Sequence, residues 1–452
     1  MSVGSNSPAI AQSVNFTGTA QDDDNDTLLT QWDFGDGTTV VNTLSTSHSW
    51  AAAGDYVVRF TVTDLKGGIA EYAELVDVGQ PSLEIAPQTA LDGLVNTFTT
   101  GDQTDVVVAS NQGTQSVIAW TSAGQDGSGN GVYARRYVNG VASGAVFLVN
   151  TTTTGDQEEP AVAMDASGNF VIAWAGRGSG DTDDNIYFQR FNASGTKLGG
   201  EVRVNTETFA SQLNTSIAMN RTNGNFVVMW ASNVSGDDVH FRQFNADGSA
   251  VTLSEQDIPG GQPFSRTSIA MADDGSFVAV WNNDSGKEGL TDNSGLGVFA
   301  RRYNSDGSAA TSVFQVNTTI ADDQDLPDVA FDSNGTYTIV WESTGQDGDG
   351  GGIVMRNFSA TNVGGSEIIA NATTDSEQNE PHIAIDSANR RIVTWRVGPS
   401  NTISSGGPPS PGDLGHRAFD ASGQPLTAET TTNVLKNYFS GVDVAALSTP
   451  GG

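Results

Sequence analysis

Residues 161–174 read Ala-Val-Ala-Met-Asp-Ala-Ser-Gly-Asn-Phe-Val-Ile-Ala-Trp. Two apolar runs flank a polar Asp-Ala-Ser-Gly turn, and this pattern predicts two antiparallel strands joined by a hairpin. The same frame recurs along the chain, and each copy ends at a tryptophan: Trp120, Trp174, Trp230, Trp281, Trp341 and Trp395. Because self-similarity at a nearly fixed period is typical of repeat architectures, these six copies, spaced 51 to 60 residues apart, decide the fold of most of the chain.

Each repeat continues through two further strands. A Gly- and Asp-rich loop follows the tryptophan and leads to a third strand that ends in Arg and an aromatic, as in Arg301-Arg302-Tyr303. After a turn with Gly at its end, a fourth strand closes on Val316-Asn317-Thr318. Radial stacking covers both faces of such four-stranded antiparallel sheets. We therefore expect residues 81–452 to form a six- or seven-bladed β-propeller, and the competing architecture is a linear string of small sandwiches.

The number of blades depends on remnants at the two ends of the array. Val95-Asn96-Thr97 matches the end of a fourth strand, and residues 442–446 match the first strand of a seventh unit. Either the ring closes with strands from both ends, or the array belongs to a longer one. The repeats resemble the propeller-type repeats of large bacterial surface proteins, and this resemblance implies no particular activity.

The first eighty residues follow a different pattern. Trp32-Asp33-Phe34-Gly35-Asp36-Gly37 is followed by His48-Ser49-Trp50 and by the alternating strand 56–64. Short strands separated by turns predict a small sandwich here. The motifs closely resemble the PKD domain family, and the resemblance implies an immunoglobulin-like sandwich in residues 1–80 that serves extracellular proteins as a spacer or contact module. The fold class expected for the whole chain is therefore all-β, a PKD sandwich followed by the propeller.

Two features of this first domain have alternative readings. Trp32 and Trp50 either fill the core of the sandwich or form a platform that stacks on sugars, and the central position of their strands favours the core. The acidic run at 22–26 is either a calcium site or a solvated loop. The sequence leaves this second choice open.

The amino-acid composition excludes some classes of binding partner. The chain has 53 acidic and 20 basic residues, a formal net charge of −33, and such a surface repels nucleic-acid phosphates and anionic lipids while it attracts divalent cations. Without cysteine, the chain has no disulfide and no thiolate chemistry. Its apolar stretches are too short to span a membrane, and its first residues lack a signal-peptide pattern. We expect an extracellular or cell-surface protein of bacterial type whose signal peptide is not part of this chain, with no direct membrane insertion.

Aspartates in the Gly-rich loops are the candidate metal ligands. Calcium prefers several oxygen ligands, and Asp alternating with Gly lets a tight loop supply carboxylates and carbonyls together. Asp-Gly also forms ordinary β-turns, so each loop is either a calcium site or a turn. The candidates are Asp126, Asp181, Asp183, Asp184, Asp237, Asp238, Asp347 and Asp349.

Two other repeated residue types have a structural and a functional reading. The Arg before each aromatic either pairs with carboxylates across strands or presents a basic ring to an anionic ligand, and the strongly acidic composition favours pairing. The six repeat tryptophans are expected to form the core between blades rather than a binding platform.

The sequence shows no catalytic or cofactor-binding cluster. The four histidines, His48, His240, His382 and His416, occupy non-equivalent positions. We therefore predict a non-enzymatic structural or adhesive protein that assembles into filaments or a surface layer, with copies of itself, surface or matrix proteins, or glycans as partners. The alternative is a secreted carbohydrate-binding or polysaccharide-degrading protein, because 53 acidic residues leave room for the carboxylate pair that glycosidases use.

Overall fold

The computed structural model describes residues 1–21, 27–64, 66, 68–79, 95–178, 180–232, 238–258, 266–284, 294–398, 413–432 and 444–445. The regular elements in these residues are all β-strands, which confirms the all-β prediction. Consequently, no membrane-spanning helix is present in the part of the chain that the structure describes. The chain divides into two compact units, whose main bodies are Met1–Leu91 and Asp92–His416, and each is described by itself.

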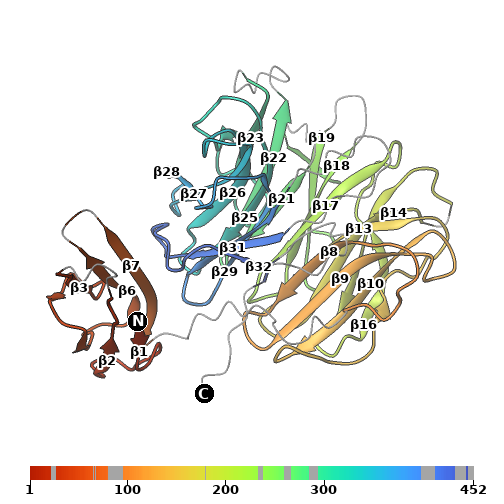
Figure 1. The fold of residues 1–452 in the computed structure, drawn as a ribbon. Helices are drawn as coiled ribbons and strands as arrows, with labels where there is room; N and C mark the ends of the chain where they lie inside the picture. Colours follow the sequence, from red (N-terminus) through yellow and green to blue (C-terminus); the bar gives the residue numbers. More distant parts are fainter. Residues whose placement is uncertain are drawn as a thin grey trace. The chain divides into compact units, whose positions relative to one another are not determined.

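The first unit contains a sandwich of two antiparallel sheets (Figure 1). One sheet has the order β1-β2-β5 and the other β4-β3-β6-β7. Because alternate residues of β2 and β3 are buried, each of these strands presents one face to the core. The strands are β1 Ser2–Val3, β2 Val14–Thr17, β3 Leu29–Asp33, β4 Thr39–Val41, β5 Ser45–His48, β6 Gly54–Thr63 and β7 Ile69–Val78.

Trp32 and Trp50 lie in the core of this sandwich, at most 1% exposed. Their indole N–H groups donate to the backbone carbonyls of Thr43 and Phe34, at 3.0 Å each, so both polar atoms are satisfied inside the protein. The core reading is therefore confirmed, and neither ring is available to stack on a sugar. The acidic run at 22–26 lies outside the described residues.

The second unit contains six antiparallel sheets that follow one another along the chain (Figure 1). Five are four-stranded meanders, and the first has a divided fourth strand, so the predicted four-stranded unit is confirmed. Blade 1 is β8 Gln103–Ser110, β9 Gln115–Ala123, β10 Asn130–Val138, β11 Val141–Ala142 and β12 Phe147–Leu148; blade 2 is β13 Gln157–Met164, β14 Phe170–Gly176, β15 Asn185–Phe191 and β16 Lys197–Arg203; blade 3 is β17 Gln212–Met219, β18 Phe226–Ser232, β19 Asp238–Phe244 and β20 Gln256–Ile258.

Blades 4 to 6 have the same order of strands. Blade 4 is β21 Thr267–Met271, β22 Phe277–Asp284, β23 Leu296–Tyr303 and β24 Phe314–Gln315; blade 5 is β25 Gln324–Phe331, β26 Tyr337–Thr344, β27 Gly351–Phe358 and β28 Gly364–Ile369; blade 6 is β29 Gln378–Ile385, β30 Arg391–Val397, β31 Asp413–Phe419 and β32 Thr430–Thr432. The first strand of each blade is called its inner strand below.

The repeat tryptophans form the core between blades. Five of the six are at most 1% exposed, and Trp120 is 4% exposed. Trp174 of blade 2 packs in one cluster with Val117 and Val132 of blade 1, and Trp230 of blade 3 packs with side chains of blade 2. Trp281 and Trp341 pack against the preceding blade in the same way. Blades 2 to 5 therefore bury the strand that carries the tryptophan against the preceding blade, and the core prediction is confirmed.

Val95 occupies the place of a fourth-strand end, as its sequence predicted. Its carbonyl accepts a hydrogen bond from Arg135 of blade 1 at 3.1 Å. The carbonyl of Val204 accepts the equivalent bond from Arg242 of the next blade, at 2.7 Å. Of the segment expected to begin a seventh unit, 442–446, only Val444 and Ala445 are described, so that prediction lies largely outside the described residues.

A buried Asn and a Glu tie the fourth strands of blades 1, 2, 4 and 5 to their surroundings. Oδ1 of Asn150 accepts the backbone N–H of Val132, and the same bond recurs at Asn205, Asn317 and Asn371. In the following loop, the backbone N–H of Thr151 donates to Glu201 of the next blade at 2.6 Å. The capping glutamates are Glu201, Glu255, Glu367 and Glu429. We call this contact the glutamate cap.

Several of the repeated arginines bind groups other than the carboxylates that the sequence suggested. Arg136 donates to the carbonyl of Ser194 at 2.7 Å, and Arg190 donates to the carbonyl of Ala246 at 2.8 Å, in each case in a turn of the next blade. Others stack over an aromatic, as Arg301 does 5.4 Å above the ring of Tyr303. Because these arginines point to turns and fourth strands, they also do not form a basic ring around the axis.

Candidate functional site

The inner strands carry a β-bulge at the same position in five blades. The bulge residue has a left-handed backbone in each case, with φ between 50° and 55° at Asp105, Glu159, Asn214, Leu326 and Glu380. Such a conformation costs a residue with a side chain about 1–2 kcal/mol, and glycine would avoid that cost. A bulge also re-aims the side chain away from the regular pleat. The same strained backbone therefore recurs at one position of five blades. Backbone strain of this kind is concentrated at functional sites in proteins.

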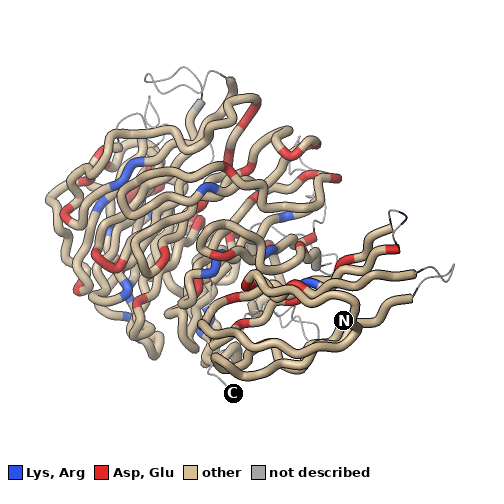
Figure 2. Tube along the Cα trace, turned by 90° about the vertical axis from the view of Figure 1, so that its left-hand side faces the viewer, with Lys and Arg blue, Asp and Glu red and all other residues tan. Residues whose placement is uncertain are grey.

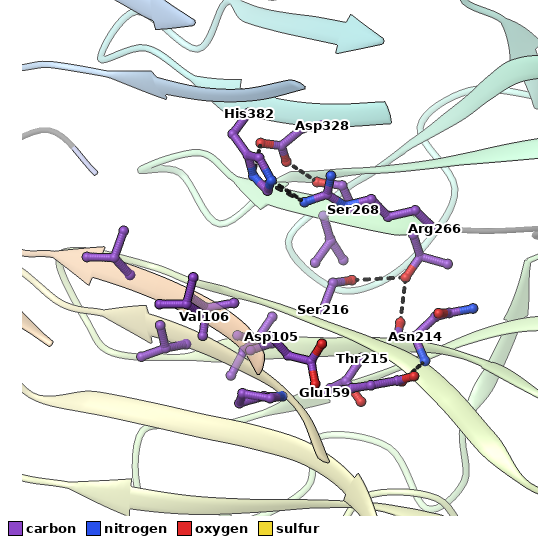
Figure 3. A pocket seen from close by; sticks show the side chains of 18 of the residues that line it. Asp105, Val106, Glu159, Asn214, Thr215, Ser216, Arg266, Ser268, Asp328 and His382 are labelled. Atoms are coloured by element: carbon purple, nitrogen blue, oxygen red, sulfur yellow. Dashed lines mark hydrogen bonds and ion pairs between the residues drawn. The ribbon is translucent and has the colours of Figure 1, made fainter. Parts of the chain in front are cut away.

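These side chains surround a cavity of about 540 Å³ between the inner strands (Figure 3). All six blades contribute to its wall, and its volume lies within the range of about 300–1,000 Å³ that is usual for small-molecule sites. The bulge residues, with Arg266 at the corresponding place in blade 4, form a largely polar rim. Deeper in the cavity the wall is apolar, formed by Val108, Val162, Ile217, Ile269 and Ile383.

At the opposite end of the inner strands, side chains cross between blades. Arg221, in the turn after β17, donates to the side chain of Gln112 and to the carbonyl of Asn111. Gln112 in turn donates to the carbonyl of Ile385 at 2.8 Å. These bonds join blades 3, 1 and 6 at the end away from the bulges. We therefore take the rim of bulge residues as the entrance of the cavity.

One wall of the cavity is acidic. Glu159 of blade 2 accepts the backbone N–H of Asn214 at 2.6 Å. Burial, together with the nearby carboxylates of Asp105 and Glu158, raises the pKa of Glu159 to about 7, although the hydrogen bond from Asn214 lowers it. Glu159 is therefore partly protonated near neutral pH, and it can both donate and accept a hydrogen bond.

The facing wall holds a connected group of polar side chains from blades 4, 5 and 6 (Figure 3). Nη2 of Arg266 lies 2.9 Å from Nε2 and 3.1 Å from Nδ1 of His382. Asp328 accepts hydrogen bonds from Ser268 Oγ at 2.7 Å and from the backbone N–H of Ile383 at 3.0 Å. Burial opposes its ionisation, but the bonds and charges of His382 and Arg266 lower the pKa of Asp328 to about 2.

Two predicted calcium loops, in blades 1 and 5, have the same conformation. Gly124 N–H donates to the carbonyl of Gly129, and the loop at 345–350 closes by the equivalent bond. Gly131 lets Asp126 approach closely, since a Cβ there would lie 2.9 Å from Oδ2. Oδ2 of Asp126 is buried without a hydrogen-bond partner, whereas Oδ2 of Asp347 accepts a bond from Asn371 at 2.6 Å.

The other predicted metal ligands are dispersed or engaged. Asp181 accepts hydrogen bonds from Tyr187 and from the backbone N–H of Gly178, and Arg177 donates to Asp184. Asp183 accepts from its neighbour Thr182, and Asp349 is exposed. Asp237 lies outside the described residues, and Asp238 opens β19. Within the described residues, no three His, Asp or Glu side chains are grouped so that they could hold a metal ion.

The structure does not place any predicted loop aspartate on the wall of the cavity, and the sequence reasoning did not find the residues that line it. A signal was present in the spacing. Asp105, Glu159, Arg266, Leu326 and Glu380 each stand fifteen residues before a repeat tryptophan, and Asn214 stands sixteen before Trp230. A position that is constant in spacing but variable and mostly polar in identity is typical of side chains that face a site rather than a core.

Several solved structures are distantly similar to this chain. A protein of unknown function from Dyadobacter fermentans is 13% identical, with a TM-score of 0.43 over 66% of this chain and 91% of that chain. The K499G mutant of NanB sialidase from Streptococcus pneumoniae is 8% identical, with a TM-score of 0.43 over 86% and 92%. A GH43 endo-arabinanase from Bacillus licheniformis is 13% identical, with a TM-score of 0.34 over 59% and 99%. At these values the likenesses carry no argument about function.

A part of the chain is similar to a curated protein. Seventy residues, or 15% of this chain, are 36% identical to collagenase ColA of Clostridium perfringens, and the match spans 6% of that protein's length. Residues 2–76 match the PKD domain family. The sandwich at the N-terminus is therefore a PKD domain, as its motifs predicted.

Proposed function

We propose that this protein is an extracellular protein of bacterial type that binds a carbohydrate in the central cavity of its propeller. The observation that carries the proposal is the convergence of bulge side chains from the inner strands on one cavity. Carboxylates, an amide and hydroxyls from Asp105, Glu159, Asn214 and Ser216 are the kinds of groups that pair with the hydroxyls of a sugar. The PKD domain supports an extracellular location.

The residue types of the cavity wall also predict whether sugar binding is driven by enthalpy or by entropy. Among the described residues that line the cavity, none is Phe, Tyr or Trp, and the one aromatic ring, that of His382, is contacted by Arg266, so we do not expect ring stacking to be the main source of affinity there. Along the described chain, acidic positions are more frequent than basic ones (Figure 2), in agreement with the 53 acidic and 20 basic residues of the sequence. Recognition by hydrogen bonds gives a favourable enthalpy that is partly offset by ordering. We therefore expect exothermic binding in calorimetry.

Asp105→Asn and Asn214→Asp test the proposal with changes that conserve shape. Each exchanges donors and acceptors at the rim, and we expect each to weaken binding about tenfold or more, since a hydrogen bond to a charged group contributes about 1.5–3 kcal/mol. A glycan array selects the saccharide, and titration calorimetry on the full chain measures its affinity.

Asp306→Asn is the matched control, because Asp306 lies in the turn of blade 4 away from the cavity and bonds only within that turn. Its affinity should equal that of the unaltered chain. If the folded protein bound none of the saccharides on the array, the proposal would fail.

Hydrolysis of the bound sugar is a second candidate function. The cavity holds one carboxyl group with a raised pKa, Glu159, and one with a lowered pKa, Asp328, and such a separation is the means by which sites assign acid and base roles. The prediction that the protein is not an enzyme therefore stays untested. Release of reducing ends from the selected glycan, lost in Glu159→Gln while binding persists, would establish hydrolysis.

Calcium binding stays a proposal, and the structure favours the loop of blade 1. Because Oδ2 of Asp126 is buried and has no hydrogen-bond partner, this oxygen is available as a ligand for a cation. We expect millimolar calcium to raise the melting temperature, and Asp126→Asn to remove this rise. Asp347→Asn is the control, since Oδ2 of Asp347 already accepts a bond from Asn371. If calcium did not change the melting temperature, the loop of blade 1 would not be a calcium site.

Assembly into filaments or a surface layer, with copies of the chain or surface proteins as partners, likewise stays a proposal. Sedimentation velocity at rising protein concentration, with and without calcium, tests it directly. Growth of large species would support an adhesive or structural role, and a monomer throughout would oppose it.

A further inference from the structure

We infer that the sugar bound in the cavity carries an anionic substituent, a carboxylate or a sulfate, and that Arg266 binds this group. The inference rests on the proposed function and adds the chemical class of the ligand. It starts from a contrast within the wall: among the described residues that line the cavity, Arg266 is the only Arg or Lys.

Arg266 is held at a fixed place. It directly precedes β21, and its guanidinium contacts the ring of His382 in blade 6. His382 lies 3.6 Å from the carboxylate of Asp328, which Ser268 and the backbone of Ile383 hold through hydrogen bonds. Three blades therefore fix the position of one guanidinium at the entrance, and a preorganised cation loses little freedom when it binds a ligand.

The guanidinium keeps donors for a ligand. A guanidinium has five N–H donors, and within the described residues the hydrogen bonds of Arg266 are those of Nη2 to the His382 ring. Arg266 lines the cavity and is partly exposed, and within the described residues neither Nε nor Nη1 takes part in a hydrogen bond. Nη2 carries two N–H groups, and one of them together with the neighbouring N–H of Nε or of Nη1 forms a pair of parallel donors that matches the paired oxygens of a carboxylate or a sulfate.

The remaining charges of the wall limit what else the ligand can be. Asp328 is compensated by His382 and Arg266, and Glu380 lies 3.6 Å from Arg396. Asp105 and Glu159 remain on the wall opposite Arg266 (Figure 3). A simple anion would be repelled by that wall, whereas the hydroxyls of a sugar donate to it. The cavity thus fits one acidic group and several hydroxyls in the same molecule.

Titration calorimetry on the full chain with three sets of probes tests the inference. The probes are di- and trigalacturonate, uncharged galactose oligomers of the same length and linkage, and the same oligomers sulfated at one hydroxyl. We expect one acidic set to bind about tenfold or more tightly than the uncharged set. Tighter binding of galacturonate assigns the carboxylate, and tighter binding of the sulfated set assigns the sulfate.

Arg266→Gln should abolish this preference, so that acidic and uncharged oligomers bind the folded variant with similar affinity. Arg266→Lys, which keeps the charge but not the paired donors, should retain only part of it. Lys197→Gln, which changes a cation on β16 outside the cavity wall, is the matched control and should retain all of it.

Three outcomes would overturn the inference. Equal affinity for acidic and uncharged oligomers would refute it while the proposed carbohydrate binding stands. Loss of both affinities in Arg266→Gln, with a lowered melting temperature, would show that Arg266 only supports the structure. Absence of binding by every oligomer, together with a blank glycan array, would refute the proposed function itself.

Discussion

Replacing Arg391 by methionine is expected to lower the free energy of unfolding of the propeller by about 3–5 kcal/mol, because the change leaves a buried carboxylate without its cation. Nη2 of Arg391 lies 3.0 Å from Oδ2 of Asp332, and the two side chains are only 1% and 2% exposed. Arg391 belongs to β30 of blade 6, and Asp332 belongs to the turn after β25 of blade 5. The pair therefore joins two blades. Urea unfolding followed by tryptophan fluorescence measures the change.

Arg177→Met is the control for this experiment. Arg177 also contacts a carboxylate, with Nε 3.0 Å from Oδ1 of Asp184, but its side chain is 51% exposed. Water replaces the lost partner there, so we expect a change of no more than about 1 kcal/mol. If Arg177→Met and Arg391→Met cost the same, burial of the Arg391 pair would not be the reason for its strength. Adding Asp332→Asn to Arg391→Met should recover part of the loss.

Replacing Glu342 by glutamine is expected to stabilise the protein in alkaline solution. Burial, together with the neighbouring carboxylates of Asp325, Glu377 and Glu380, raises the pKa of Glu342 to about 8. In the unfolded chain the same group ionises near its usual pKa of 4.5. The folded state thus holds a proton that the unfolded state has already lost, so stability falls as pH rises from about 4.5 to about 8.

Glutamine does not titrate and resembles the protonated acid in shape. The variant should match the unaltered chain near pH 4.5 and exceed its free energy of unfolding by about 3 kcal/mol above pH 8, a value reduced from the full linkage because water reaches part of the group. Asp102→Asn, at an exposed position before β8, should show no such growth with pH. A Glu342→Gln difference that is constant across pH would show that burial does not perturb this carboxyl.

The sequence was sufficient for the architecture because the responsible signals are local and repeated. The apolar runs before each tryptophan predicted the inner strands and the cores between blades, and the burial of Trp174 and Trp230 confirms this. In the first eighty residues, the segment Trp32–Gly37, the segment His48–Trp50 and the alternating strand after them predicted the PKD sandwich. Both signals depend on alternation and turn chemistry, which act within a few residues of each other.

The site was not predictable in the same way. The bulges place Asp105 and Glu159 in a conformation that their own residue types disfavour, so propensity pointed away from it. The contact of Arg266 with His382 joins residues 116 positions apart, and nothing in either local sequence signals it. Charge counting suggested that arginines pair with carboxylates, but a carbonyl in a neighbouring turn, such as that of Ala246, is an equally good acceptor that composition cannot reveal.

The glutamate cap has a consequence for how the chain acquires its structure. Each capped loop is completed by a residue about fifty positions further on, as Thr151 is by Glu201 and Thr206 is by Glu255. A blade that has just formed therefore still has unpaired backbone N–H groups until the following blade folds against it. Nearest-neighbour dependence of this kind makes order propagate from one unit to the next. We expect a chain shortened by its last blades to lose protection from hydrogen exchange first at the loop of the newly terminal blade.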